Sequence, residues 1–475
     1  MANETFTAAS FASGLSLELV PPAVAARAKA LTLDFLASAV RARGEAESTP
    51  AILASLAALG LDGPGPATVM GDERGYIAPI AALLNGALGH SLDFDDTHAE
   101  SSLHPSAPVV SAALTAGELV GASGRTVLTA IIAGYEVCCR LGLALDPTAH
   151  YARGFHPTAT AGVFGAAAAA GKVFDLDPQQ MVSAFGVAGS QAAGSLQFLH
   201  NGAWTKRWQV GAAAMNGLMA ASLARQGFLG PDQAIEGRHG FLAGYSDGAR
   251  AERAVQDLGR DWETLKVAVK PYPCCRYAHA ALDGLIALRL HHGIPAAEVR
   301  SVEIGLHRNG VALVGEPEAA KRRPRNVVEG QFSMPFTAAV ALDQGRFSWD
   351  DYARLGEPFI DALCDRITVR QDDRVEAASP HPFGARVRLV TAGGVHELAI
   401  PDPSGEPDSF PDEDALRAKF MTLAGPALGE RAGLLAGAVL DLDSFGDVRA
   451  ALRFGRPVNP EDVAGLLEAT CGGRG

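Results

Sequence analysis

The chain has 475 residues, a formal net charge of −13, and 48% hydrophobic and 20% charged residues. This length allows two or three domains with buried cores. The acidic balance argues against a general nucleic-acid binder or a membrane-surface protein, because both partners are anionic. A small anionic substrate stays possible, since a local group of cations can override the overall charge.

Cysteine spacing and the N-terminus indicate a cytoplasmic protein. The cysteines form two adjacent pairs and two single residues, which fits neither a disulfide framework nor a C-x-x-C metal site, so we expect reduced thiols. The N-terminus carries Glu4 and no basic region typical of a signal peptide. The longest nearly apolar runs, such as residues 158–171, are too short for a membrane span. The six cysteines are Cys138, Cys139, Cys274, Cys275, Cys364 and Cys471.

Residues 21–230 have the hydrophobic spacing of helices. Pro22 suits the first turn of a helix, and Val24, Ala28 and Leu31 follow at helical spacing. Three later segments consist almost wholly of Ala, Gly, Ser, Thr and Val, and helices with such small side chains can approach closely. We therefore expect a tightly packed bundle. The three segments are residues 109–120, 160–171 and 211–224.

The pattern changes near Lys270, where strands begin to alternate with helices. Residues 298–307 have a period of two, which predicts a strand, and residues 366–369 predict another. Residues 386–390 and 395–400 flank a glycine pair and predict a hairpin. A helix is expected over residues 333–342, and helical spacing returns from Glu413.

These patterns predict a mainly α fold with an inserted α+β domain. Both chain ends, residues 1–265 and 409–475, would form the helical domain. Residues 266–408 would form a smaller lid domain.

The densest polar cluster follows an apolar helix and contains three histidines. If that helix continues through Thr97, then Asp93 and Thr97 share one face. Pro105 breaks the pattern, which puts His104 on a loop or at a helix start. A carboxylate beside a histidine suits proton abstraction near neutral pH. A solvated acidic helix end is the alternative interpretation. The cluster comprises His90, Asp93, Asp95, Asp96, Thr97, His98, Glu100 and His104.

Three further groups are candidates for substrate binding. Lys206 and Arg207 can grip carboxylates, the arginine through a planar fork, or they can form an exposed helix end. Residues 270–279 combine Lys, Tyr, Arg and His in a proline-held segment, which suits the edge of a cleft or an ordinary linker. His156 precedes a helix, where a cap or core histidine is the more common case.

Taken together, these segments resemble the MmgE/PrpD family of 2-methylcitrate dehydratases, cis-aconitate decarboxylases and iminodisuccinate epimerases. The matching segments follow one another in the family's order through nearly the whole chain. The run from His90 through Asp93-Phe94-Asp95-Asp96-Thr97 to His104-Pro105-Ser106 is its most specific part. The other matching pieces are Asn85-Gly86, Thr205-Lys206-Arg207, residues 227–231, Lys270-Pro271-Tyr272-Pro273-Cys274 with His279, residues 331–336 and Lys419-Phe420.

The resemblance implies a homodimer with an inserted lid that needs no cofactor and no metal. Carried over by position, it makes His104 the general acid/base and Lys270 a second proton-transfer group or carboxylate anchor. Asp93, with a catalytic role, would orient the substrate together with Thr97. Asp95 and Asp96 would support the site. The remaining expected substrate-binding residues are His156, Lys206, Arg207, Tyr272 and His279.

The family's common chemistry is an enolate-like centre next to a carboxylate of a small polycarboxylate. Dehydration of a 2-methylcitrate-like hydroxy acid is our first expectation, and decarboxylation or epimerisation stays open. A metal-dependent hydrolase using His90, Asp93 and His104 is an alternative of another class. A relative that only binds an acid or a partner is a third.

The chain departs from the family pattern at three places. His98 is an extra residue between Thr97 and the His-Pro-Ser motif. Trp208-Gln209 follows Lys206 and Arg207 where Leu-His is frequent, and Phe336 stands where Tyr is frequent. Each difference lies where substrate choice could be set.

Overall fold

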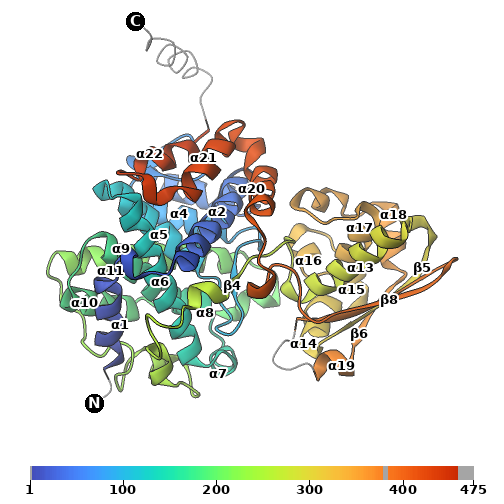
Figure 1. Cartoon of the computed structure of the whole chain (residues 1–475), viewed down its shortest axis with the longest axis horizontal. Coiled ribbons are helices and arrows are strands. Elements are labelled where there is room, and N and C mark those ends of the chain that lie inside the picture. The colour runs from blue at the N-terminus through green and yellow to red at the C-terminus, as the bar shows by residue number, and fades with distance from the viewer. Residues whose placement is uncertain (1–2, 378–382, 458–475) are drawn as a thin grey trace, which may run out of the picture. The chain divides into compact units, whose positions relative to one another are not determined.

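The computed structural model describes residues 3–377 and 383–457. The chain divides into two compact units, one formed by Met1–Ala268 with Asp412–Gly475 and the other by Val269–Pro411. The described residues are mostly helical, with a few short strands (Figure 1). A mainly α chain with some strands, as expected from the hydrophobic spacing, is therefore confirmed.

The first unit is built from helices and two short strand pairs. Strand β1 (Pro64–Thr68) pairs with β2 (Gly75–Tyr76), and β3 (Thr97–His98) pairs antiparallel with β4 (Val267–Ala268). Its helices are α1 (Glu4–Gly14), α2 (Pro22–Glu45), α3 (Thr49–Ala58), α4 (Ala78–Gly89), α5 (Ser106–Val120), α6 (Gly124–Leu145), α7 (Pro147–Ala152), α8 (Pro157–Thr160), α9 (Gly162–Val173), α10 (Pro178–Gly189), α11 (Thr205–Arg225), α12 (Phe241–Tyr245), α20 (Glu413–Leu428), α21 (Arg431–Leu440) and α22 (Arg449–Leu452).

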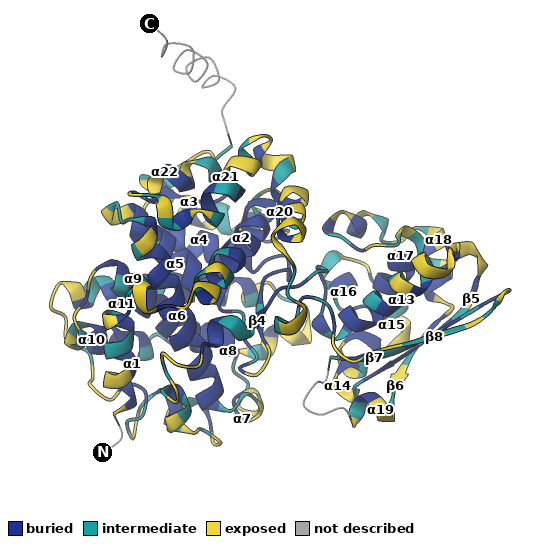
Figure 2. Cartoon of the chain, in the orientation of Figure 1, coloured by how far each residue is buried: buried dark blue, intermediate teal, exposed yellow. Residues whose placement is uncertain are grey.

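Small residues let the central helices of this unit pack closely. Helix α11 packs against α4 and α9, and α9 packs against α5 and α6. A Cβ added at Gly211 would lie 2.4 Å from the Leu83 carbonyl oxygen, and one at Gly217 would lie 2.4 Å from the Ala166 Cβ. Both positions therefore require glycine for the close approach. Figure 2 shows α4, α5 and α6 as mostly buried, in agreement with the predicted small-residue bundle.

Helix α6 is long and apolar enough to cross a membrane, but its apolar window is completely buried inside the first unit. Its buried charged residues Glu136 and Arg140 lie one turn apart and pair at 3.3 Å. Burial on every side with an internal ion pair is what the core helix of a globular unit shows.

The C-terminal helices of this unit return to its N-terminal part. Helices α20 and α21 both pack on α2, so segments far apart in the sequence lie side by side (Figure 1). Helix α2 begins with Pro22 in its first turn, as predicted. This return is what brings Lys419 of α20 to the candidate site described below.

The second unit is a four-stranded sheet with helices. The strand order is β6-β5-β7-β8, in which β5 pairs parallel with β6 and antiparallel with β7, and β7 forms a hairpin with β8. The predicted strands and hairpin are thus confirmed. Helix α13 packs on β7, β8 and α17. The elements are β5 (Val299–Leu306), β6 (Ile367–Gln371), β7 (Ala385–Thr391), β8 (Gly394–Ile400), α13 (His279–His292), α14 (Arg308–Gly310), α15 (Glu318–Arg322), α16 (Val327–Gln331), α17 (Met334–Gln344), α18 (Pro358–Cys364) and α19 (Asp373–Glu376).

The described cysteines are reduced, as expected from their spacing. Cys138 and Cys139 lie in α6, Cys274 and Cys275 precede α13, and Cys364 ends α18; all five are buried, and none of them is in a disulfide. The expectation for Cys471 falls outside the described residues.

Candidate active site

The acidic-histidine segment leaves the helix before its carboxylates begin. Helix α4 ends at Gly89, Asp93 has a positive φ of 53°, and Thr97 lies in strand β3. The predicted helix through Thr97 is therefore wrong. Pairing of β3 with β4 imposes an extended backbone, and an aspartate tolerates the left-handed conformation that redirects the chain. Asp93 and Thr97 consequently do not share a helical face.

Asp95 lies between two histidines. Its Oδ2 is 2.7 Å from His90 Nδ1, and its Oδ1 is 3.6 Å from His104 Nδ1. The two imidazole rings meet edge to face, with centroids 4.7 Å apart. Asp95 and His90 are buried, whereas the His104 side chain keeps 15% exposure. A positive charge formed on either ring would therefore be met by a buried carboxylate.

The surroundings of His104 define which of its nitrogens can accept a proton. His104 lies just before α5, as the prolines predicted. Its Nδ1 is 2.8 Å from the Asp96 carbonyl oxygen, which can only accept, so Nδ1 carries the hydrogen. In the neutral ring Nε2 then has the lone pair. The backbone N–H of His104 donates to Thr158 Oγ1, which holds the backbone from which the imidazole projects. This geometry makes Nε2 competent as a base.

Asp96 supports the loop rather than facing the histidines. Its carboxyl group accepts from Ser106 Oγ at 2.7 Å and from the Ser106 N–H at 3.3 Å, at the start of α5. Ser106 Oγ also lies 2.6 Å from the Tyr135 hydroxyl. Burial, followed by the negative charge of Asp95, raises the pKa of Asp96 well above its usual range. The protonated form of Asp96 is thereby favoured.

Two residues that sequence reasoning did not place in the site hold this loop from outside. Lys419 Nζ lies 2.6 Å from Asp34 Oδ1, donates to the Phe94 carbonyl oxygen at 3.0 Å and sits 3.8 Å from the centre of the Phe94 ring. A signal existed for Asp34, because it is a single acid within an otherwise buried stretch of α2. Buried charges normally have a partner, here one 385 residues away in the sequence.

Lys206 brings a cation to the acidic loop. Its Nζ lies 2.9 Å from Asp93 Oδ1, and the two side chains are 22% and 11% exposed. Burial alone would lower the pKa of Lys206, but the charge of Asp93, its hydrogen bond and the nearby Asp95 together raise that pKa. Lys206 therefore stays protonated and suits a substrate carboxylate.

Arg207 points elsewhere. Its guanidinium donates to Ser48 Oγ at 3.1 Å, just before α3, and burial lowers the pKa of Arg207. The described contacts do not join Arg207 to the histidines, so its expected grip on a substrate carboxylate stays a prediction.

His156 and Thr97 add two polar groups. The His156 ring stacks with His90 at a centroid distance of 5.9 Å, and its Nδ1 lies 3.2 Å from Gln209 Oε1. Burial, followed by the positive charges that His90 and Lys206 can carry, lowers the pKa of His156 well below its usual range. Thr97 Oγ1 is buried and has no hydrogen-bond partner among the described residues. An unpaired buried hydroxyl is costly, and the expected role of Thr97 in orienting the substrate stays a prediction.

Lys270, Tyr272 and His279 belong to the second unit. Lys270 is buried, the Tyr272 hydroxyl donates to Asp283 Oδ1 at 2.7 Å, and burial raises the Tyr272 pKa. His279 Nε2 donates to the Cys274 carbonyl oxygen, and the His279 and Tyr272 rings meet edge to face at 5.3 Å. Tyr272 and His279 are thus in contact, and the action of Lys270, Tyr272 and His279 together with His104 stays a prediction.

Phe336, which stands where the family often has tyrosine, is a core residue of the second unit. Its ring stacks at 5.9 Å on Tyr352, whose hydroxyl donates to the Pro273 carbonyl oxygen at 2.6 Å. A phenol thus does reach the segment after Lys270, but Tyr352 supplies it.

The metal-site alternative does not fit the residues proposed for it. Asp93 pairs with Lys206, and the described group whose ligand atoms lie within 4.8 Å of one another is His90, Asp95 and His104. Asp95 already accepts from His90, and His104 Nδ1 already donates to a carbonyl. A cation here would displace the His90–Asp95 hydrogen bond and face the charge of Lys206. The metal-dependent hydrolase is therefore not favoured.

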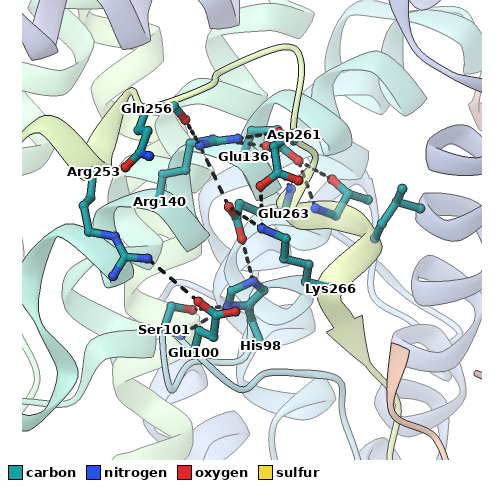
Figure 3. Close-up of polar contacts among 12 residues, drawn as sticks. His98, Glu100, Ser101, Glu136, Arg140, Arg253, Gln256, Asp261, Glu263 and Lys266 are labelled. Carbon is teal, nitrogen blue, oxygen red and sulfur yellow. Dashed lines mark hydrogen bonds and ion pairs between the residues drawn. The ribbon is translucent and has the colours of Figure 1, made fainter. Parts of the chain in front are cut away.

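A second buried polar network begins at His98, the residue next to Thr97 (Figure 3). The Ser101 N–H donates to His98 Nδ1, so Nε2 carries the hydrogen that it donates to Glu263 Oε2 at 3.0 Å. Burial alone would raise the pKa of Glu263. The hydrogen bond from His98 and the charges of Lys266 and Arg140 outweigh it and lower this pKa to about 2.

The same network continues to α6. The Glu136 carboxylate accepts from the N–H groups of Glu263 and Thr264 and from the Thr264 hydroxyl, and it pairs with Arg140. The Arg140 guanidinium also donates to the carbonyl oxygens of Gln256 and Asp261 (Figure 3). This network fixes the segment that leads into β4, and hence the partner strand of Thr97.

Comparisons with known proteins agree with this arrangement. Residues 7–254 match the MmgE/PrpD N-terminal domain, and residues 272–442 match the MmgE/PrpD C-terminal domain. A cis-aconitate decarboxylase from Aspergillus terreus is 30% identical over 468 residues, covering 93% of this chain and 94% of the relative. A cis-aconitate decarboxylase-like protein, oryM, from Aspergillus oryzae is 28% identical over 82% of this chain and 84% of its own length.

A shorter match adds a distant organism. The cis-aconitate decarboxylase of Homo sapiens is 30% identical over 230 residues, which is 47% of each chain. Together with the two domain matches, which cover nearly the whole chain in order, these similarities show that the chain belongs to the MmgE/PrpD family.

Proposed function

We propose that this chain is a lyase that needs no cofactor and transfers a proton at a carbon next to a carboxylate of a small polycarboxylate. The observation that carries this proposal is the pairing of a proton-transfer group with a cation. His104 presents an unprotonated Nε2 while its Nδ1 is held by the Asp96 carbonyl, and Lys206 stays charged beside Asp93. A base and a fixed cation are what an enolate-like intermediate requires.

Decarboxylation of a cis-aconitate-like acid is the first reaction we propose, because two relatives that span most of the chain carry that name. In such an acid the bond to CO2 breaks, and its electron pair forms a new double bond as the old one shifts. The carbon at the far end of the allylic system then takes a proton. In this reaction His104 would act in its protonated form and give that proton from Nε2, and Lys206 would stabilise the charge on the neighbouring carboxylate.

Dehydration of a hydroxy acid is the second candidate, and it is favoured by the lone pair on His104 Nε2. Here the base removes the proton next to a carboxylate, the C–O bond on the adjacent carbon breaks, and the hydroxyl leaves as water after receiving a proton. Lys270 of the second unit would act as the second proton-transfer group. In this proposal the second unit serves as a lid, and the protein works as a homodimer in the cytoplasm.

The test is incubation with a panel of di- and tricarboxylates in heavy water, followed by NMR. Loss of a carboxyl carbon with deuterium at the allylic position identifies decarboxylation. Loss of the hydroxyl-bearing carbon signal with new alkene protons identifies dehydration, and deuterium in an otherwise unchanged acid identifies epimerisation. If no acid in the panel reacts or exchanges, the proposed lyase function is wrong.

A further inference from the structure

Gln209 sets the hydrogen-bonding character of His156. It lies in α11, one turn after Lys206, and its amide orientation is fixed because Nε2 donates to the Ser195 carbonyl oxygen at 2.9 Å. Oε1 therefore faces His156 Nδ1 at 3.2 Å. An amide oxygen only accepts, so His156 Nδ1 must carry the hydrogen, and Nε2 of the neutral ring has the lone pair.

The backbone holds both members of this pair in place. The His156 N–H donates to the Gly194 carbonyl oxygen, and the Leu196 N–H donates to the Gly154 carbonyl oxygen, each at 2.9 Å. The segment that carries His156 is thus tied to the segment whose Ser195 carbonyl orients Gln209. A Cβ added at Gly194 would lie 2.8 Å from the Ala159 Cβ, so this approach is close. No other described residue hydrogen-bonds the His156 ring.

The charges around His156 keep it neutral. Burial lowers its pKa first, and His90 at the end of α4, Lys206 in α11 and His150 in α7 act in the same direction; Gln209 opposes them. A neutral ring with a lone pair on Nε2 repels a carboxylate, which has no hydrogen to donate. It attracts a hydroxyl group, which has one.

We propose that Gln209 is a positioning residue that fixes His156 as a hydrogen-bond acceptor and thereby selects polycarboxylates that carry a hydroxyl group. In this proposal Lys206 attracts the substrate carboxylates, and His156 Nε2 accepts a hydrogen bond from the substrate hydroxyl. This inference rests on the proposed polycarboxylate site and favours its second candidate reaction, dehydration, because a cis-aconitate-like acid has no hydroxyl group. A site that is built to pair with a hydroxyl rejects the analogue that lacks it, because the buried acceptor is then left unpaired.

The first test compares binding of citrate and tricarballylate, which differ only by one hydroxyl group, by isothermal titration calorimetry. We expect the unmodified protein to bind citrate about tenfold more tightly. Gln209→Leu removes the acceptor for Nδ1–H and should reduce this preference to about twofold or less. Gln226→Leu, the same change at the exposed C-cap of the same helix, should keep the full preference. Equal binding of both acids to the unmodified protein, or an unchanged preference in Gln209→Leu, would overturn the inference.

The second test reads the imidazole itself and separates positioning from a structural role. We expect ¹⁵N NMR of labelled histidine to show the signal assigned to His156, by its loss in His156→Asn, as the Nδ1–H tautomer. Gln209→Glu places a carboxylate beside Nδ1, so it should raise the pH at which this signal protonates by about one unit. An Nε2–H tautomer, or no shift in Gln209→Glu, would contradict the proposal. Failure of these tests leaves any turnover in the heavy-water panel untouched, so the two proposals fail separately.

Discussion

Two buried polar networks meet at strand β3 of the first unit, and they differ in how completely their groups are paired. The network that starts at His98 is closed: Glu263 has donors from His98 and Lys266, and Glu136 is met by Arg140 and Thr264. The polar network of the preceding loop, residues 90–96, is open where the loop reaches Thr97, because the buried Thr97 hydroxyl has no partner among the described residues.

The charges of the open network are arranged differently too. Asp93, Asp95 and Asp96 follow one another closely, and burial together with the neighbouring carboxylate raises the pKa of Asp96. Lys206 lies 2.9 Å from Asp93 as a cation on that side, His90 and His104 flank Asp95, and the His156 ring stacks on His90. Proteins keep such arrangements where they do chemistry, whereas closed networks hold segments in place. The comparison predicts that changes in the open network alter activity and changes in the closed one alter stability.

The largest expected effect is on activity, at His104. In His104→Asn the amide nitrogen can replace Nδ1 as donor to the Asp96 carbonyl, but nothing replaces Nε2. We expect kcat to fall roughly 100- to 10,000-fold, the usual range for a lost general acid/base. The melting temperature should stay near that of His291→Ala, an exposed histidine of the second unit. Near-normal turnover in His104→Asn would remove this residue from the mechanism.

The closed network should show its effect as stability at Glu263. Since the pKa of Glu263 is lowered to about 2 in the folded chain, its contribution is complete above the ordinary value of 4.5 and is lost as the pH falls toward 2. Glu263→Gln should therefore lower the free energy of unfolding by roughly 2–4 kcal/mol at pH 7.

Urea unfolding of the unmodified protein and Glu263→Gln at several pH values measures this difference. The difference in the free energy of unfolding between the two proteins should become smaller as the pH falls from 5 to 3. In this range the Glu263 carboxylate of the unmodified protein loses its stabilising contribution, which the variant lacks at every pH. The kcat of the folded variant should stay within about twofold, since His98 and Glu263 act through β4 and not on substrate. A large loss of kcat at full stability would make this network part of the active site.

Sequence reasoning found the cluster of acids and histidines but not the path of its backbone. His90, Asp93 and His104 are close in sequence, so their local density is visible in a single stretch of chain. The local spacing allows a helix through Thr97, and only pairing with Ala268, far along the chain, makes Thr97 extended. Pairings of that kind leave no periodic signal near the residue itself.

The same reason explains which supports were missed. The hydrogen bond from Lys419 to Asp34 joins residues 385 apart, and that from His98 to Glu263 joins residues 165 apart. Hydrophobic periodicity, in contrast, is local, and it predicted the small-residue helices of the first unit and the β7–β8 hairpin of the second correctly. The contact of Arg207 with Ser48 could not be predicted from the sequence, since a Lys-Arg pair at a helix start does not indicate which neighbours the two side chains will contact.

An intermediate effect is expected at Lys206, where binding and stability can be separated. Lys206→Met removes the charge at nearly the same length and leaves Asp93 without its cation, so substrate KM should rise roughly 10- to 100-fold and stability should fall. The double variant Lys206→Met with Asp93→Asn removes both charges and should recover the stability but not the KM. Recovery of both would show that the pair is only structural.

The smallest effect, and the sharpest for the comparison, is expected at Thr97. Thr97→Val keeps the shape and the strand preference of the side chain and removes a hydroxyl that has no partner among the described residues, so the protein should be as stable as before or more stable by about 1 kcal/mol. Thr158→Val is the matched control, because the Thr158 hydroxyl oxygen accepts from the His104 N–H and its loss should destabilise the protein.

The same variants test substrate binding. If the Thr97 hydroxyl hydrogen-bonds the substrate, KM should rise about tenfold in Thr97→Val and recover in Thr97→Ser. Thermal unfolding and steady-state kinetics on the three variants decide this. A Thr97→Val protein that is destabilised like Thr158→Val, with unchanged KM, would place Thr97 in the closed network with His98.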